Sequence, residues 1–405
     1  MRITPIEVKS ERQVEKFMIS LGVSPEGARI LSPKSRYWTF KLEGIKSWEA
    51  NIIKQHLLSL GSDAAIERAA LIKNIKTTAF IFGNLSQLRK LCQKLENQPF
   101  ALREISQSLS LYLDNLDKKE LVLCAGNKVL KIKKPIICGI VNVTDDSFSG
   151  DGMLTISKAS DKKLTELVLR KVTGMVKEGA KIIDIGGESS RPFSKRISAA
   201  QEAKRVIPII KILRKKFKNT IISLDTYKYM IAKKGVDCGV DIINDITALR
   251  ADTKIASLVK KHKLGCILMH MKGRPSTMQI NPKYKDVVEE ELDFFKERLS
   301  FCSTKGISRS QILIDPGIGF GKRLQDNTKI LKELYKFKIF GVPIFLGLSR
   351  KSFIGKIVNV KVDERLIGTI AASVIAVSKG ANILRVHDVA QTAQAFKIVA
   401  KISNN

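Results

Sequence analysis

The sequence predicts an α/β protein in which a small α/β domain precedes a (β/α)8 barrel. From residue 135 onward, short β-branched runs alternate with amphipathic helical stretches, the pattern of parallel βαβ units. Eight such runs favour a closed barrel over an open sheet. We expect the strands at residues 135–143, 181–187, 220–226, 241–246, 265–271, 311–317, 342–349 and 382–388.

The stretches between these runs have helical periodicity, and they predict the outer ring of a barrel. We expect helices at residues 164–177, 203–217, 229–236, 254–261, 289–303, 328–336 and 365–379, with residues 390–402 closing the ring. Barrel enzymes build their sites from residues at the carboxyl ends of the strands. Polar residues gather at those positions: Asn142, Asp184, Asp225, Asn244, His270, Asp315, Ser349 and His387.

The amino-terminal part has its own apolar patterns and predicts a separate domain over residues 1–125. A chain of 405 residues exceeds what one hydrophobic core usually organises. Strands are expected at residues 38–45 and 78–82, and helices at residues 49–60, 64–72 and 87–95. A possible hairpin around Gly126 and Asn127 leads into the barrel domain, residues 126–405.

The composition is that of a globular protein, with 44% hydrophobic and 27% charged residues. The net charge of +32 raises nucleic acid, anionic membranes or anionic small molecules as partners. The basic residues are spread over all the predicted helices, without a zinc-finger or RNA-binding signature, so we expect no nucleic-acid partner. No apolar run predicts a membrane helix. Six widely spaced cysteines are typical of reduced thiols, and a cytoplasmic protein is predicted.

Eight motifs, one for each predicted strand, resemble the signatures of the dihydropteroate synthase family in the order in which that family carries them. They are NVTDDSFS at 142–149, DIGGESSRP at 184–192, LDTYK at 224–228, INDI at 243–246, LMHM at 268–271, DPGIGFGK at 315–322, GLSRKS at 347–352 and RVHDV at 385–389. The chain departs from the family at Asp145, where proline is usual, at residues 150–152, which read Gly-Asp-Gly instead of Asp-Gly-Gly, and at Ser190, where threonine is usual.

The resemblance implies an enzyme of folate biosynthesis, a transferase of the kind that sulfonamides target. Its reaction would join 6-hydroxymethyl-7,8-dihydropterin diphosphate to p-aminobenzoate and release diphosphate. Two alternatives stay open: a pterin methyltransferase barrel of the corrinoid-dependent kind, and a basic nucleic-acid-binding protein without catalysis. The glycines of residues 316–322 do not form a phosphate-binding P-loop, because Pro316 and Arg323 stand where that motif needs glycine and Ser or Thr.

The resemblance also assigns residues to the site. The pterin-binding set would be Asp225, Asn244, Met269, Asp315, Phe320, Gly347 and Lys351. Arg385 and His387 would bind the diphosphate, since the guanidinium fork of arginine suits phosphate oxygens. Asn142 would hold a Mg²⁺ on the diphosphate. Ser190, Arg191, Pro192 and Ser352 would form the p-aminobenzoate site. Of these, Asp225, Lys351, Arg385 and His387 are the expected catalytic residues.

Two points stay open at this stage. Asp225, Asp315 and Lys351 could instead form a structural ion-pair network, and His270 is as much a structural as a functional candidate. The expected partners are the two small-molecule substrates and a second copy of the chain, because family members are commonly homodimers.

Overall fold

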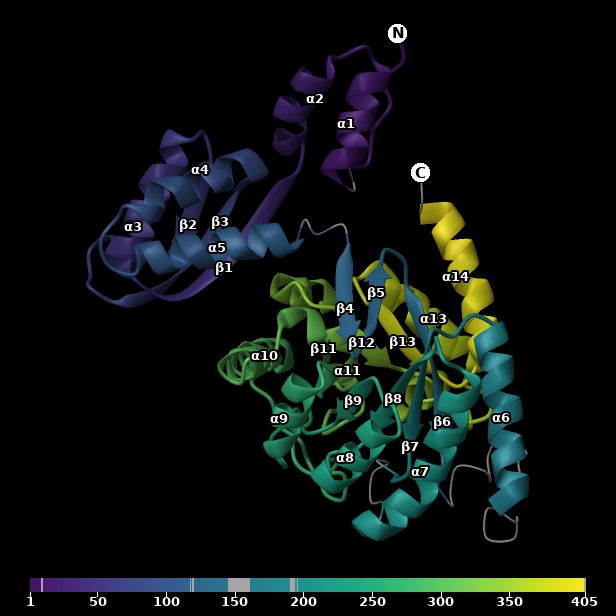
Figure 1. The fold of residues 1–405 in the computed structure, drawn as a ribbon. Coiled ribbons are helices and arrows are strands. Elements are labelled where there is room, and N and C mark those ends of the chain that lie inside the picture. Colours follow the sequence, from purple (N-terminus) through teal and green to yellow (C-terminus); the bar gives the residue numbers. More distant parts are fainter. Residues whose placement is uncertain are drawn as a thin grey trace. The chain divides into compact units, whose positions relative to one another are not determined.

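The computed structural model describes residues 1–8, 10–116, 118, 120–144, 161–189, 194, 196–403. The chain forms two compact units, Met1–Asp117 and Lys118–Asn405. Each is described by itself (Figure 1). Among the described helices, none is long and apolar enough to cross a membrane.

The first unit contains a three-stranded antiparallel sheet in the order β1-β3-β2. Its elements are α1 (Glu11–Ser20), α2 (Pro25–Leu31), β1 (Tyr37–Lys46), α3 (Ser47–Ser59), β2 (Asp63–Ile66), β3 (Lys76–Asn84), α4 (Leu85–Glu96) and α5 (Leu102–Leu116). Helix α4 begins at a reciprocal cap, in which Asn84 and Gln87 each accept the backbone N–H of the other. Its buried leucines recur every three or four residues and pack into the core of this unit.

The prediction of a helix at residues 64–72 is wrong. This segment forms strand β2 and a short 3-10 helix, Arg68–Leu71. Ala64 pairs with Ile81 of β3 and is 1% exposed, so the small side chain fits beneath the sheet. Pairing with β3 therefore overrides the helical propensity of an alanine-rich stretch. Helices α1, α2 and α5 were not expected.

The second unit is an eight-stranded parallel barrel, which confirms the predicted fold class. The strands are β6 (Ile136–Asn142), β7 (Ile182–Gly186), β8 (Ile221–Asp225), β9 (Ile242–Asp245), β10 (Gly265–Met269), β11 (Ile312–Asp315), β12 (Phe345–Gly347) and β13 (Ile383–Val386). Their order is β11-β10-β9-β8-β7-β6-β13-β12. A parallel bridge between Ile314 and Ile344 closes the ring.

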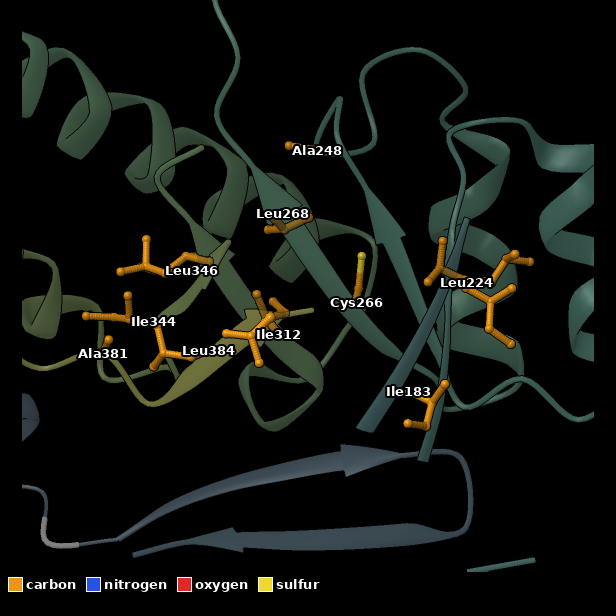
Figure 2. Packing of buried hydrophobic residues seen from close by; sticks show 14 of the residues in the cluster. Ile183, Leu224, Ala248, Cys266, Leu268, Ile312, Ile344, Leu346, Ala381 and Leu384 are labelled. Atoms are coloured by element: carbon orange, nitrogen blue, oxygen red, sulfur yellow. The ribbon is translucent and has the colours of Figure 1, made fainter. Parts of the chain in front are cut away.

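Helices surround this ring and bury the outward-facing strand residues. They are α6 (Asp161–Lys177), α7 (Ala199–Lys216), α8 (Tyr229–Asp237), α9 (Lys254–Lys261), α10 (Val287–Thr304), α11 (Leu324–Lys332), α12 (Ser352–Val358), α13 (Leu366–Ser378) and α14 (Val389–Ser403). Figure 2 shows part of the apolar layer, in which Ile183, Leu224 and Leu384 are strand residues.

Alternation along each strand separates this outer layer from the barrel interior. Ile182, Ile221 and Ile383 pack together inside the barrel, whereas the residue after each of them packs against the helices. One further step along each strand points inward again. On β7 and β13, the inward residues are Asp184 and Arg385, so the strand period itself brings charged groups into the barrel.

A hairpin of β4 (Leu121–Ala125) and β5 (Lys128–Ile132) covers the amino ends of the barrel strands. Leu123, Ala125 and Ile132 pack against the first inward residues of those strands. Lys128 Nζ donates to Thr220 O at 2.8 Å and to Asp241 Oδ2 at 2.9 Å. The hairpin therefore belongs to the barrel unit, Lys118–Asn405.

Candidate active site

The carboxylate of Asp184 lies at the centre of the polar interior. Its side chain is 0% exposed and accepts from three groups on three other strands. The Arg385 Nε–Oδ2 distance is 2.6 Å, the Ser223 Oγ–Oδ1 distance is 2.6 Å, and the Asn244 Nδ2–Oδ2 distance is 3.2 Å. Asp184 therefore fixes the orientation of both Asn244 and Arg385.

Asp225 lies beside this group, at the carboxyl end of β8. The register pairs Asp225 with Asn244 on one side and with Gly186 on the other. Its Oδ2 is 3.2 Å from Arg385 Nη2, so one guanidinium bridges two carboxylates. A pocket next to Asp225 is lined by residues from several strand-end loops, including Glu188, Tyr227, Ile246 and Pro275.

The electrostatics of this group follow from burial and from the shared arginine. Burial and the nearby charge of Asp184 raise the pKa of Asp225 to about 7, although Arg385 opposes the shift. Burial alone would lower the pKa of Arg385, but Asp184 and Asp225 outweigh it, so that pKa is raised. The guanidinium therefore stays charged, and near neutral pH Asp225 can both hold and release a proton.

A second polar group consists of Asp315 on β11 and Lys351 after β12. Asp315 Oδ1 accepts from Gly317 N at 2.8 Å, and Lys351 Nζ donates to Ile318 O. Burial raises the pKa of Asp315 to about 6, and Lys351 opposes this shift. Burial also lowers the pKa of Lys351 to about 7, against the attraction of Asp315. The Phe320 ring centroid is 4.7 Å from Lys351 Nζ, a cation–π contact.

Apolar residues line the mouth beside these charges. Met269, at the end of β10, is 3% exposed and clusters with Ile246, Met271 and Met278. Tyr227 and Phe320 pack against the same cluster. An apolar wall next to paired carboxylates, an amide and a lysine suits a flat heterocycle with a polar edge.

The other described residues of the predicted site lie at the same ends of the strands. Asn142 ends β6, with its Oδ1 close to Gly186. His387 Nδ1 is 2.9 Å from Ser349 Oγ. Gly347 pairs with Arg385, and a Cβ there would lie 3.7 Å from Lys351 Nζ, at ordinary contact distance, which places Gly347 beside the lysine. Ser352 begins α12 and is exposed. Ser190, Arg191 and Pro192 lie outside the described residues.

The sequence prediction did not give Asp184 a role, although it placed that residue at a strand end. The signal available was the two-residue period of β7, which puts Asp184 inward between Ile182 and Gly186. His270, for which the sequence did not decide between a structural and a functional role, is buried and contacts Lys322 and Glu291.

Comparison with known proteins gives the class to which this architecture belongs. The model of the pterin binding enzyme family matches residues 138–387. The chain therefore belongs to the pterin binding enzyme family. A Haemophilus influenzae dihydropteroate synthase is 42% identical over 283 residues, which cover 70% of this chain and 99% of that protein. The Escherichia coli K12 dihydropteroate synthase is 40% identical over 277 residues, covering 68% and 95% of the two chains.

Solved structures agree with these relatives. A Yersinia pestis dihydropteroate synthase in a sulfonamide drug complex has a TM-score of 0.65 and 36% identity, covering 70% of this chain and 100% of its own. The Xanthomonas albilineans dihydropteroate synthase with 4-aminobenzoic acid has a TM-score of 0.64 and 36% identity, covering 71% and 99% of the two chains. Within its family, this chain is an enzyme of the dihydropteroate synthase group, a transferase, and not a pterin methyltransferase.

Proposed function

We propose that Asp225, Asn244, Asp315 and Lys351 bind the pterin ring during dihydropteroate synthesis. The observation that carries the proposal is their convergence at one end of one barrel, together with an apolar cluster that includes Met269. A 2-amino-4-oxo heterocycle presents donors to carboxylates and an acceptor to an amide or ammonium. Met269 and Phe320 would contact the faces of the ring, and Gly347 leaves space beside it.

Diphosphate leaves the exocyclic methylene carbon of the pterin with the electrons of the C–O bond. The delocalised cation that remains is attacked by the nitrogen of p-aminobenzoate, which then loses a proton. No side-chain nucleophile is required, so the protein acts through position and charge. Arg385 and His387 would neutralise the departing diphosphate. The contacts of Arg385 with Asp184 and Asp225 use only part of its N–H donors, which supports this role.

A Mg²⁺ ion fits the residues in one specific way. Within the described parts of the chain, no group of three His, Cys, Asp or Glu could hold a metal. Mg²⁺ commonly keeps several waters and binds through one or two protein oxygens and substrate phosphates. The Asn142 amide oxygen, at the end of β6, is a suitable single ligand. When bound, the ion would supply positive charge to the diphosphate.

The p-aminobenzoate site is proposed to consist of Ser352 with Ser190, Arg191 and Pro192. Ser352 starts α12 directly after Lys351, so its place is next to the pterin residues. The 4-aminobenzoic acid bound in the Xanthomonas albilineans enzyme supports the substrate class for this chain.

The test is isothermal titration of the full chain with the pterin diphosphate, with and without Mg²⁺, followed by addition of p-aminobenzoate and detection of released diphosphate. We expect Mg²⁺-enhanced binding and release that requires p-aminobenzoate. The Asp225→Asn variant should keep its fold and lose most of its turnover. Wild-type kcat/KM in this variant would remove Asp225 from the site, and no diphosphate release by the wild type would refute the function.

We also propose that the chain is a homodimer through barrel helices. Helix α13 supports this proposal, because Ile367 and Ile375 are 81% and 52% exposed on it. A contiguous apolar patch marks an interface, and these two isoleucines are the residues of α13 that would contribute to one. Light scattering of the wild type and of Ile367→Glu tests this proposal, with a dimer expected for the first and monomers for the second. A monomeric wild type would refute it.

The cytoplasm is the compartment that we propose. All six cysteines are unpaired, and four of them are buried, which fits a reducing environment. Localisation of a tagged full-length chain in fractionated cells tests the proposal.

A further inference from the structure

The loop after β11, residues 316–322, has its backbone carbonyls held by side chains. Five consecutive carbonyl oxygens each accept from a side-chain donor: Gly317 from Lys322, Ile318 from Lys351, Gly319 from Gln279, Phe320 from Lys322 and Gly321 from Tyr284. A buried loop has no regular backbone hydrogen bonds of its own, so its carbonyl groups need such partners. This scaffold therefore fixes the loop in one conformation.

Glycines allow the loop to approach the neighbouring backbone closely. Gly317 and Gly321 have φ of 66° and 64°. A Cβ at these positions would lie 2.0 Å from His270 O and 2.2 Å from Lys272 O. The loop after β11 is thus packed directly on the backbone that follows β10.

Lys322 is the centre of this scaffold. Its side chain is 0% exposed, and Nζ lies 2.9 Å from His270 Nδ1 and 3.2 Å from Glu291 Oε1. Three carbonyl oxygens surround the same nitrogen at 3.1–3.3 Å, those of Gly317, Phe320 and His270. Carbonyl oxygens only accept, so these three partners match an ammonium with three donors better than a neutral amine.

The partners of Lys322 fix its protonation and that of the histidine. Burial, reinforced by the charge of Lys322, lowers the pKa of His270 to about 2, so the imidazole is neutral. Burial lowers the pKa of Lys322, and Glu291 opposes this shift as the counter-charge from α10. Asp326 from α11 and Asp315 from β11 also favour the charged lysine.

On this geometry, we propose that Lys322 is a positioning residue for dihydropteroate synthesis, acting through residues 316–322 on Lys351 and Asp315. The loop connects them physically: Gly317 N donates to Asp315, Ile318 O accepts from Lys351, and Phe320 stacks on Lys351. Glu291 and His270 complete the buried cluster that holds the lysine in place. The proposal rests on the proposed function, because it concerns the residues to which pterin binding is assigned.

The first test replaces Lys322 with methionine, which has a similar length and no charge. We expect kcat/KM for the pterin diphosphate to fall about tenfold to a hundredfold, the effect of a small misplacement of binding groups. Lys332→Met is the matched control, because Lys332 is an exposed residue of α11. The control should keep wild-type kinetics.

The pH profile of kcat/KM separates this role from simple support of the fold. Lys351 is faced by Asp315 of β11, Asp225 of β8, Arg385 of β13 and Lys322, and the charge of Lys322 lowers the pKa of both Lys351 and Asp315. Lys322→Met should therefore move the acidic and the alkaline limb to higher pH. A lysine that supports the fold without acting on Lys351 and Asp315 would leave both limbs in place.

The second variant, Glu291→Gln, changes the cluster in the opposite sense. Burial raises the pKa of Glu291 to about 8, against the charge of Lys322, so Glu291 supplies its counter-charge mainly on the alkaline side. Without that charge, Lys322 should lose its proton at lower pH and release the loop, so the alkaline limb should move to lower pH. This variant keeps the lysine and decides the question even if Lys322→Met does not fold. If the wild type is active and the folded variants have the same pH profiles of kcat/KM as the wild type, this inference alone is overturned. A wild type that neither binds nor converts the pterin diphosphate would overturn the proposed function and this inference with it.

Discussion

Replacement of Asp184 by asparagine removes a charge and nearly no volume from the centre of the site. Asp184 binds Arg385 at 2.6 Å, Ser223 at 2.6 Å and Asn244 at 3.2 Å, and it is 0% exposed. The amide oxygen can still accept from Arg385 and Asn244, while the hydroxyl of Ser223 can turn and accept from the new amide nitrogen. The variant therefore tests the charge more than the shape.

The expected magnitude follows from the partners that remain. Removing one member of a buried ion pair costs about 3–5 kcal/mol when the other member is left alone. Arg385 keeps Asp225 as a partner at 3.2 Å, so the lower end, about 3 kcal/mol, is the appropriate value. For a unit of this size, such a loss lowers the melting temperature by about 5–10 °C.

Catalysis should respond more strongly than stability. With Asp184 neutral, Arg385 is drawn to Asp225, which then has less freedom to bind a pterin, and kcat/KM should fall about tenfold to a hundredfold. The negative charge of Asp184 raises the pKa of Asp225, so its removal should move the limb of the pH profile that reports Asp225 from near pH 7 to lower pH.

The assays are calorimetric melting and the pH dependence of kcat/KM from diphosphate release. Asp293→Asn, the same change at an exposed position of α10, is the control. Asp184→Asn with wild-type kcat/KM and an unshifted acidic limb would refute the reasoning that Asp184 orients the site by its charge.

Four further outcomes are expected. Wild-type kcat/KM should fall as the pH rises through about 7, because the pKa of Lys351 is lowered to about 7 and its neutral amine has one donor fewer. Lys351→Met should remove this alkaline limb of the pH profile and most of the activity. Phe320→Leu should raise KM for the pterin diphosphate about tenfold and change kcat less in steady-state kinetics, because the ring contact with Lys351 is lost. Asn142→Ala should reduce the gain in pterin diphosphate affinity that titration measures on adding Mg²⁺; an undiminished gain would exclude Asn142 as ligand. Lys128→Met, which loses the contact with Asp241, should destabilise the barrel by about 1 kcal/mol in urea unfolding and leave kcat unchanged.

The barrel was predictable because its strands have a strong local signal. Ile182, Ile221 and Ile383 begin apolar runs bounded by polar loops, and each run proved to be a strand. The expected clustering of polar groups at the strand ends follows from parallel pairing alone. The segment at residues 64–72 failed because an alanine-rich sequence does not specify whether a neighbouring strand is available.

The internal contacts of the site were not predictable to the same degree. Asp184 contacts Ser223 and Arg385, which are 39 and 201 residues away in the sequence. Lys322 contacts His270, which is 52 residues away. Such pairings depend on the register between strands and on the path of a loop, which local periodicity does not contain.

The hairpin beneath the barrel bears on the chemistry above it. Leu123, Ala125 and Ile132 close the interior at the amino ends of the strands, one layer below Asp184 and Arg385. A flat substrate resting on the open end would cut these charges off from bulk water. The local dielectric would then fall, and the electrostatic attraction between Arg385 and the departing diphosphate would be stronger than in the enzyme without substrate.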